Sequence, residues 1–295
     1  MENNTYSLIM AGGVGSRFWP MSTQHNPKQF LDVLGIGKSL LRLTFERLLG
    51  VSDSSKIYIL TNERYRDLVL SQLPELTSEQ VICEPERKNT APCIAFAAAK
   101  ILGINPNATL VISPSDHLII NTNRFVSLIN TAVTEANQGQ LVTLGIQPSR
   151  PDTGYGYIEV EPGQHAAGSV KKVHRFCEKP SLDVAKSFVE EGNYFWNSGI
   201  FIWRADVILD AMKLYSNALY HIFCESLGSY NTPMEEEFMR NAFSAAEDIS
   251  IDFAVMEHAT NVSVVLSDFD WSDLGTWNSA YEAMEKDYFA NAVAS

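Results

Sequence analysis

Residues 6–20 read YSLIMAGGVGSRFWP, a compact apolar run that ends in a glycine-rich loop. The run Tyr6–Met10 has the character of a strand that is buried on both faces of a sheet. Glycines directly after such a strand let the backbone approach a ligand closely, and their N–H groups can hold phosphate oxygens. Arg17 adds a planar, permanently charged guanidinium. The segment therefore indicates a strand followed by an anion-binding loop, and the alternative is a tight turn that binds nothing.

Apolar runs and helical patterns alternate along the chain from this loop to about residue 145. Further strands are predicted at Lys56–Leu60, Thr109–Ser113 and Leu141–Leu144, and helices at Leu40–Leu49, Arg64–Leu73, Ala91–Leu102 and Phe125–Asn137. Such alternation implies right-handed βαβ units, which build a mostly parallel sheet covered by helices. We therefore expect an α/β protein.

The character of the sequence changes from Gly156 onward, where the predicted strands suit a mixed sheet. Strands are predicted at Tyr157–Val160, Val170–Cys177 and Phe195–Trp203, and helices at Leu182–Glu191, Ala205–Tyr215 and Trp277–Lys286. We find no repeat, low-complexity stretch or long linker in the sequence. One continuous domain over residues 1–295 is therefore expected rather than two independent ones.

The composition is that of an ordinary globular protein, because 295 residues that are 45% hydrophobic can bury a large core. No early segment resembles a signal peptide, and no stretch approaches the roughly 20 apolar residues of a membrane span. The four cysteines are widely spaced and form no CxxC pair, so the sequence does not indicate a zinc site. We expect reduced thiols and a cytoplasmic protein.

The charge balance is acidic, since 22 Lys and Arg residues stand against 35 Asp and Glu residues and give a net charge of −13. Nucleic-acid binding is disfavoured, because it needs a basic face that displaces counterions from phosphates. A small anionic substrate remains compatible with this charge if the few basic residues converge on one cleft.

Two better-known phosphate-binding motifs fit the glycine loops poorly. In the first loop, Phe18 stands where a dinucleotide fingerprint requires its third glycine, and Pro20 would interrupt the following helix. Residues 35–39, GIGKS, end like a P-loop, but Asp32 occupies the position of the first required glycine. We interpret residues 35–39 as a turn followed by a helix start.

Residues 26–31, NPKQFL, place Lys28 beside a proline-rigidified turn, where its ammonium can neutralise a triphosphate. An isolated lysine is usually only a solvated surface charge. Together, however, the glycine loop, the segment RFWP at 17–20 and the segment PKQF at 27–30 resemble the N-terminal signature of sugar-nucleotide pyrophosphorylases. The Trp-Pro and Pro-Lys-Gln-Phe forms are similar to the mannose-1-phosphate guanylyltransferase branch of that family. Ser16 and Phe18 depart mildly from the threonine and leucine that are common there.

The resemblance implies a Rossmann-like, glycosyltransferase-A-like three-layer α/β fold with a central mixed, mostly parallel sheet. It implies a single nucleotidyltransferase domain with a nucleotide-side half at about 1–145 and a sugar-side half at about 146–290. The implied reaction transfers GMP from GTP to mannose 1-phosphate, with Mg²⁺ as cofactor, and gives GDP-mannose and pyrophosphate. Another hexose 1-phosphate with UTP or dTTP, a catalytically silent homologue and a remote nicotinamide oxidoreductase remain as alternatives, and a homodimer remains open.

The nucleotide side of the resemblance includes residues 84–92, EPERKNTAP, where Asn89 and Thr90 would contact base or ribose. Thr90 also suits a helix N-cap, with Pro92 in the first turn. The expected nucleotide-binding residues are Ala11, Gly12, Gly13, Gly15, Arg17, Lys28, Asn89 and Thr90.

Two aspartates are the expected magnesium ligands. The segment PSDH at 114–117 follows an apolar strand and resembles a family box whose aspartate, here Asp116, binds the metal. The segment WSDLGTW at 271–277 resembles the box that completes the magnesium site, here through Asp273. Each aspartate alone also suits a turn or a cap, and for His117 we expect only an orienting or packing role.

The sugar side of the resemblance consists of segments TGYGYI at 153–158, FCEKP at 176–180 and WNSGI at 196–200. It assigns Glu178 and Asn197 to sugar hydroxyls, Lys179 to the sugar phosphate, and Gly154 and Tyr155 to backbone and shape contacts. A β-hairpin with ordinary aromatic packing is the structural alternative. The expected catalytic residues are Arg17, Lys28, Asp116, Lys179 and Asp273.

The sequence after Asp273 provides little more than the predicted helix Trp277–Lys286 and a short tail. Relatives generally continue into a β-helical segment or a fused isomerase domain, so we expect that domain to be absent or truncated here.

Overall fold

The computed structural model describes residues 4–13, 15, 18–225, 227–277, 279, 281 and 286. The predicted site residue Arg17 lies outside the described residues, as does most of the predicted helix Trp277–Lys286.

A ten-stranded mixed sheet forms the centre of the described structure. Its strands are β1 (Thr5–Met10), β2 (Ile57–Asn62), β3 (Val81–Glu84), β4 (Thr109–Pro114), β6 (Leu141–Ile146), β7 (Tyr157–Glu159), β8 (Val170–Lys172), β9 (Arg175–Cys177), β10 (Tyr194–Arg204) and β11 (Val262–Ser267). The order is β3-β2-β1-β4-β10-β6-β11-β8, with β7 paired to β10 and β9. The pairs β1–β2, β1–β4, β2–β3 and β6–β11 are parallel, whereas β10 runs antiparallel to both of its main neighbours. A separate two-stranded sheet joins β5 (Leu118–Ile119) to β12 (Trp271–Ser272).

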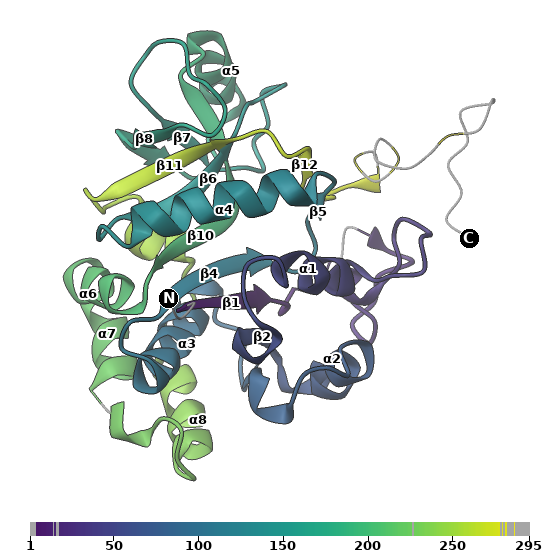
Figure 1. Cartoon of the computed structure of the whole chain (residues 1–295), viewed down its shortest axis with the longest axis vertical. Helices are drawn as coiled ribbons and strands as arrows, with labels where there is room; N and C mark the ends of the chain where they lie inside the picture. Colours follow the sequence, from purple (N-terminus) through teal and green to yellow (C-terminus); the bar gives the residue numbers. More distant parts are fainter. Residues whose placement is uncertain are drawn as a thin grey trace.

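Helices cover both faces of the sheet and complete the three-layer α/β fold (Figure 1). The helices are α1 (Leu40–Leu48), α2 (Arg66–Gln72), α3 (Thr90–Ile104), α4 (Thr122–Ala136), α5 (Leu182–Glu191), α6 (Ala205–Tyr215), α7 (Asn217–Cys224) and α8 (Glu235–Ala245). Figure 1 shows α3, α6, α7 and α8 gathered together, with α4 lying along the sheet apart from them. None of these helices is both long and apolar enough to cross a lipid bilayer.

The alternation of side chains along the central strands explains why both faces of the sheet are covered. In β1, Leu8 packs with the core under α3 and α6, while Ile9 packs with the core under α1 and α4. In β4, Ile112 and Val111 divide between the two cores in the same way. Successive strand residues point to opposite faces, so a strand that is apolar at every position must be covered on both sides.

The predicted strand Val170–Cys177 is wrong as one element, because the structure divides it into β8 and β9. The Val173 N–H donates to the Val262 carbonyl, whereas the N–H of the next residue, His174, donates to the Glu159 carbonyl. Adjacent residues thus bond to different strands, and the chain passes from one part of the sheet to another. Strands β3 and β11, which lie near opposite edges of the sheet, are not among the predicted strands.

The parallel strands bring several predicted motifs to one edge of the sheet. Because β1, β3 and β4 point the same way, the glycine loop after β1, Glu84 in β3 and Asp116 after β4 all follow carboxyl ends. The Ser115 N–H donates to the Met10 carbonyl at 3.0 Å and holds the first and last of these ends together. This edge is where ligands bind in open α/β sheets.

Candidate active site

Lys28 joins three distant segments at the carboxyl edge of the sheet. It begins a short 3-10 helix, Lys28–Phe30, directly after Pro27, and the residue is only 3% exposed. Its Nζ donates to Asp116 Oδ2 at 3.0 Å and to the Asp273 carbonyl oxygen at 2.8 Å. An ammonium group has three donors, so one remains for a ligand.

The glycine loop is held against this lysine by the neighbouring Gln29. The Gln29 amide donates to the carbonyls of Ala11, at 2.9 Å, and Gly13, at 2.8 Å. Gly15 has a φ of +61°, and a Cβ there would overlap the side chain of Lys28. Only glycine therefore lets the loop pack this closely. Ala11 itself is buried, and its N–H donates to the Leu60 carbonyl, which ties the start of the loop to β2.

Asp116 and Asp273 line the same cavity of about 270 Å³, together with Lys28 and Gly15. Burial alone would raise the pKa of Asp116, but neighbouring positive charge, chiefly the Lys28 ammonium, together with hydrogen bonds to the carboxylate holds that pKa below its ordinary value. The Tyr155 hydroxyl donates to Asp273 Oδ1 at 2.8 Å, and the Gly275 N–H donates to the same oxygen at 2.9 Å. Both carboxylates are thus held in place beside one solvent-accessible space.

His117 packs behind this pair and lines the same cavity. Its Nδ1 accepts a hydrogen bond from Trp271 Nε1 at 3.2 Å, and the two rings meet edge to face. Burial lowers the pKa of His117, and the opposing charge of Asp116 does not restore it. Through this contact with Trp271, His117 anchors the two-stranded β5–β12 sheet.

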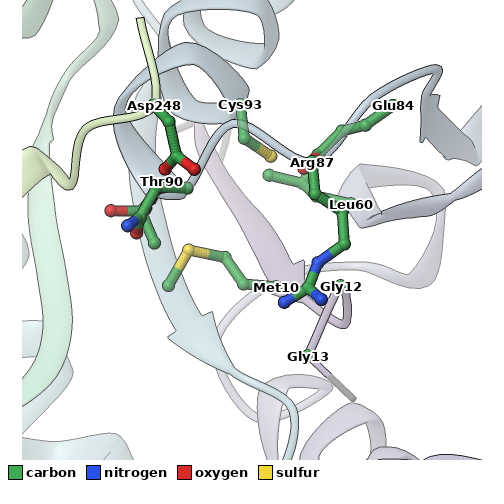
Figure 2. Close-up of a pocket in the computed structure, with 10 residues that line it drawn as sticks. Met10, Gly12, Gly13, Leu60, Glu84, Arg87, Thr90, Cys93 and Asp248 are labelled. Atoms are coloured by element: carbon green, nitrogen blue, oxygen red, sulfur yellow. Dashed lines mark hydrogen bonds between the residues drawn. The ribbon is translucent and has the colours of Figure 1, made fainter. Parts of the chain in front are cut away.

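A second cavity of about 490 Å³ opens beside the glycine loop (Figure 2). Gly12, Gly13, Asn89 and Thr90 are predicted site residues that line it. Figure 2 shows Thr90 beside Asp248 on one side, and Arg87 reaching towards Gly12 on the other.

The start of α3 differs by one residue from the predicted capping arrangement. The N-cap is Asn89, whose side chain accepts from the Thr90 N–H, so the prediction of Thr90 as the cap is wrong. Thr90 instead uses its Oγ1 to accept the Ile251 N–H at 2.8 Å, and this fixes the π-helical segment that follows Ile251. Pro92 lies in the first turn, as predicted.

The sequence reading gave no role to two acidic residues that line the second cavity, Glu84 and Asp248. Glu84 is 7% exposed, and burial raises its pKa to about 7 even though the Cys93 thiol donates to its carboxyl group. The resemblance includes the segment that contains Glu84, but the sequence does not indicate that the Glu84 side chain is buried. Asp248 comes from a loop far along the chain and had no motif to mark it.

A third cavity of about 190 Å³ brings together all five predicted sugar-side residues. These residues are Gly154, Tyr155, Glu178, Lys179 and Asn197. Its lining includes His117 and Asp273, which also line the cavity of the two aspartates. The cavity of the Lys28–Asp116–Asp273 cluster is therefore continuous in its lining with the third cavity, and it shares the glycine loop with the second.

The polar groups of the third cavity differ in how firmly they are held. Lys179 is 61% exposed along its side chain and pairs with Glu178 Oε1 at 3.0 Å, whereas the Glu178 side chain is only 9% exposed. Asn197 is buried, and its Oδ1 accepts from Thr143 Oγ1 at 2.9 Å while its Nδ2 donates to Asp252 Oδ1 at 3.0 Å. Asp252 is a further lining residue that the sequence reading missed.

The donor set at Asp116 and Asp273 fits a hard divalent cation. Two carboxylates face one cavity, and Mg²⁺ commonly takes one or two protein carboxylates and fills its other positions with water and phosphate oxygens. In the part of the chain that the structure describes, no group of three or more His, Cys, Asp or Glu side chains gathers as a metal site. A cation bound by these two carboxylates would keep coordination positions for water or substrate phosphate oxygens.

Comparisons with known proteins identify the family of the chain. The family model described as Nucleotidyl transferase matches residues 6–288. Mannose-1-phosphate guanylyltransferase from Salmonella montevideo is 39% identical, over 97% of this chain and 61% of its own length. The enzyme of the same name from Escherichia coli K12 is 38% identical, over 95% of this chain and 60% of its own length.

A solved structure shares the fold of this chain. A crystal structure described as mannose-1-phosphate geranyltransferase from Thermus thermophilus superposes with a TM-score of 0.83 at 30% identity, and covers 94% of this chain and 78% of that one. This chain spans about 60% of the length of the curated relatives named above. The family match over nearly the whole sequence and the shared fold lead to one conclusion: the chain belongs to the nucleotidyl transferase family.

Proposed function

We propose that the protein transfers GMP from GTP to mannose 1-phosphate and releases pyrophosphate. The observation that carries the proposal is the Lys28–Asp116–Asp273 cluster, whose cavity shares the glycine loop with the second cavity and shares His117 and Asp273 with the cavity of Glu178 and Asn197. A nucleotide on one side and a sugar phosphate on the other would meet at this cluster. The names of the relatives support GTP and mannose 1-phosphate as the pair.

The reaction needs no protein nucleophile. A phosphate oxygen of mannose 1-phosphate attacks the α-phosphorus of GTP in line, the bond from that phosphorus to the bridging oxygen breaks, and pyrophosphate leaves. Lys28 donates its remaining hydrogen bond to the phosphates, and Lys179 orients the attacking phosphate. A magnesium ion held by Asp116 and Asp273 would supply charge neutralisation along the phosphates.

The acids of the nucleotide cavity favour guanine as the base. Guanine presents two neighbouring donors, N1–H and the N2 amino group, and a carboxylate can accept from both. Uracil and thymine present one N3–H between two carbonyl groups. A carboxylate that accepts from this N3–H would be repelled by the two carbonyl oxygens beside it. Glu84 is a buried residue of the cavity lining. Asp248 is exposed and lines the cavity beside Thr90. We infer that Glu84 accepts hydrogen bonds from guanine N1–H and N2 and thereby selects the base.

A nucleotide panel tests both the reaction and the base. With Mg²⁺ and mannose 1-phosphate, wild-type protein should release pyrophosphate far faster from GTP than from UTP, dTTP or ATP. Glu84→Gln should narrow this preference by about tenfold or more, since one hydrogen bond to a charged group contributes about 1.5–3 kcal/mol. Glu86→Gln, an exposed change in the same loop, is the matched control. A clear preference for dTTP with glucose 1-phosphate would overturn the assignment, and an unchanged preference in Glu84→Gln would remove that residue from base reading.

Gly156 offers a test of the sugar cavity that leaves every charge in place. A Cβ at this residue would collide with Glu178 Oε2 and would also approach the Asn197 side chain. Gly156→Ala should therefore displace Glu178 and raise KM for mannose 1-phosphate by about tenfold, the loss of roughly one charged hydrogen bond. The KM for GTP should stay constant. Steady-state kinetics with each substrate varied in turn checks this, and an equal rise in both KM values would contradict a separate sugar cavity.

A further inference from the structure

Asp252 opens an unusual segment of helix beside the sugar cavity. Residues Asp252–Met256 form a π-helix, and the Glu257 N–H donates to the Asp252 carbonyl at 3.0 Å. In a π-helix the bond joins residues five apart, so Asp252 and Glu257 lie one turn apart on the same face. An α-helix would point these two side chains in different directions. Short π segments of this kind occur frequently at functional sites.

Both acids of this face act on the sugar cavity. Glu257 Oε1 accepts the backbone N–H of Glu178 at 3.0 Å and so fixes the segment that carries Glu178 and Lys179. Asp252 lines the cavity directly, and its Oδ1 accepts from Asn197 Nδ2 at 3.0 Å. This segment therefore positions Glu178 through Glu257, and it places the carboxyl group of Asp252 in the same cavity.

Among the described residues, the donors to the carboxyl group of Asp252 leave one acceptor position open. Its donors are the Asn197 amide, the Ser250 hydroxyl and its own backbone N–H. A carboxylate has about four acceptor positions, so these donors leave capacity for another. Burial raises the pKa of Asp252 to about 7, and the neighbouring Glu178 carboxylate adds to this effect. Asp252 is partly exposed and lines the cavity, so its open acceptor position can be reached by a ligand there.

We infer that Asp252 binds a hexose hydroxyl adjacent to the one that Glu178 binds, and thereby selects the sugar. Two carboxyl groups side by side match the two donors of a vicinal diol, because neighbouring ring hydroxyls point into one region of space. The sugar epimers differ in the direction of one such hydroxyl, so a paired acceptor discriminates between them. This inference rests on the proposed function and extends it to one residue.

Monodeoxy sugar phosphates test the contact through its specificity. Asp252→Asn keeps the acceptor for Asn197 and nearly the same volume, and should lower kcat/KM for mannose 1-phosphate by about 10- to 100-fold, the effect of losing a hydrogen bond to a charged group. KM for GTP should not change. Among the 2-, 3-, 4- and 6-deoxy analogues, one should be used equally by wild type and variant, because the hydroxyl that Asp252 binds is already missing. Glu247→Gln removes an exposed acid just upstream and should match wild type with every sugar.

The outcomes separate the inference from the function that it assumes. An equal loss with all analogues would show that Asp252 is structural, and wild-type kcat/KM in Asp252→Asn would show that its carboxylate does not bind the sugar. Either result would overturn the inference alone. Thermal unfolding of the variant identifies a loss that comes from misfolding, and Asp252→Ala, which removes the acceptor altogether, should then show the same dependence on the analogue. If wild-type protein makes no GDP-mannose, the proposed function fails first and the inference fails with it.

Discussion

Replacing Lys28 with alanine should lower kcat by about 10²–10³-fold, the usual effect of removing one preorganised charge contact to a transition state. Lys28 is almost fully buried, and its ammonium donates to one carboxylate and one backbone carbonyl. Its third donor is left for a ligand. Lys28 lines the cavity of the two aspartates, where charge on the transferring phosphate would accumulate. The expected loss is therefore in turnover more than in substrate affinity.

The measurement is steady-state kinetics together with thermal unfolding. Lys38→Ala is the matched control, because Lys38 is an exposed lysine in a nearby loop that pairs with Glu46 at 2.7 Å. The control should keep wild-type kcat. If Lys28→Ala lost stability in proportion to activity, the lysine would be a structural partner of Asp116 and not a phosphate ligand. Arg17→Ala is predicted from the sequence to behave like Lys28→Ala.

The sequence could predict the centre of the candidate site because its residues follow strand ends. The glycine loop after β1 and Asp116 after β4 are each marked by a buried apolar run, and parallel strands bring such ends together. Asp273 was located only through the resemblance of its segment to a family box. The structure brings it to Lys28 through a backbone carbonyl, a contact that no pattern in the side chains could indicate.

The sequence did not reveal the tertiary contacts through which several site residues act. Gln29 fixes the glycine loop from the next motif, and the Tyr155 hydroxyl holds Asp273 from the sugar side. Asp252 acquires its position from a π-helix, and no periodicity of apolar residues distinguishes a π-helix of five residues from an α-helix. Strands β8 and β9 were joined in the prediction because their sequence is continuous in character, while their partners are different.

Asp116→Asn and Asp273→Asn should each abolish most activity, and the double variant should be scarcely worse than either single one. Two ligands of one metal site act as a unit, so the second loss adds little once the first has removed the site. The structure supports this pairing, because both carboxylates line one cavity of about 270 Å³. Activity should also disappear when Mg²⁺ is chelated, while GTP should still bind weakly through the glycine loop and the Glu84 cavity.

Asparagine makes this test specific at Asp273. The Tyr155 hydroxyl and the Gly275 N–H both donate to Asp273 Oδ1, and an asparagine oxygen can accept both hydrogen bonds. The Lys28 contact goes to the backbone carbonyl and also survives. The substitution thus keeps every hydrogen bond of this residue named above and removes only the charge, which a metal needs and a capped turn does not. Asp210→Asn, an exposed change on α6, controls for loss of one negative charge. Near-normal Mg²⁺-dependent turnover in Asp273→Asn would mean that Asp273 shapes the turn alone, and Asp116 would then be the one carboxylate left to bind the metal.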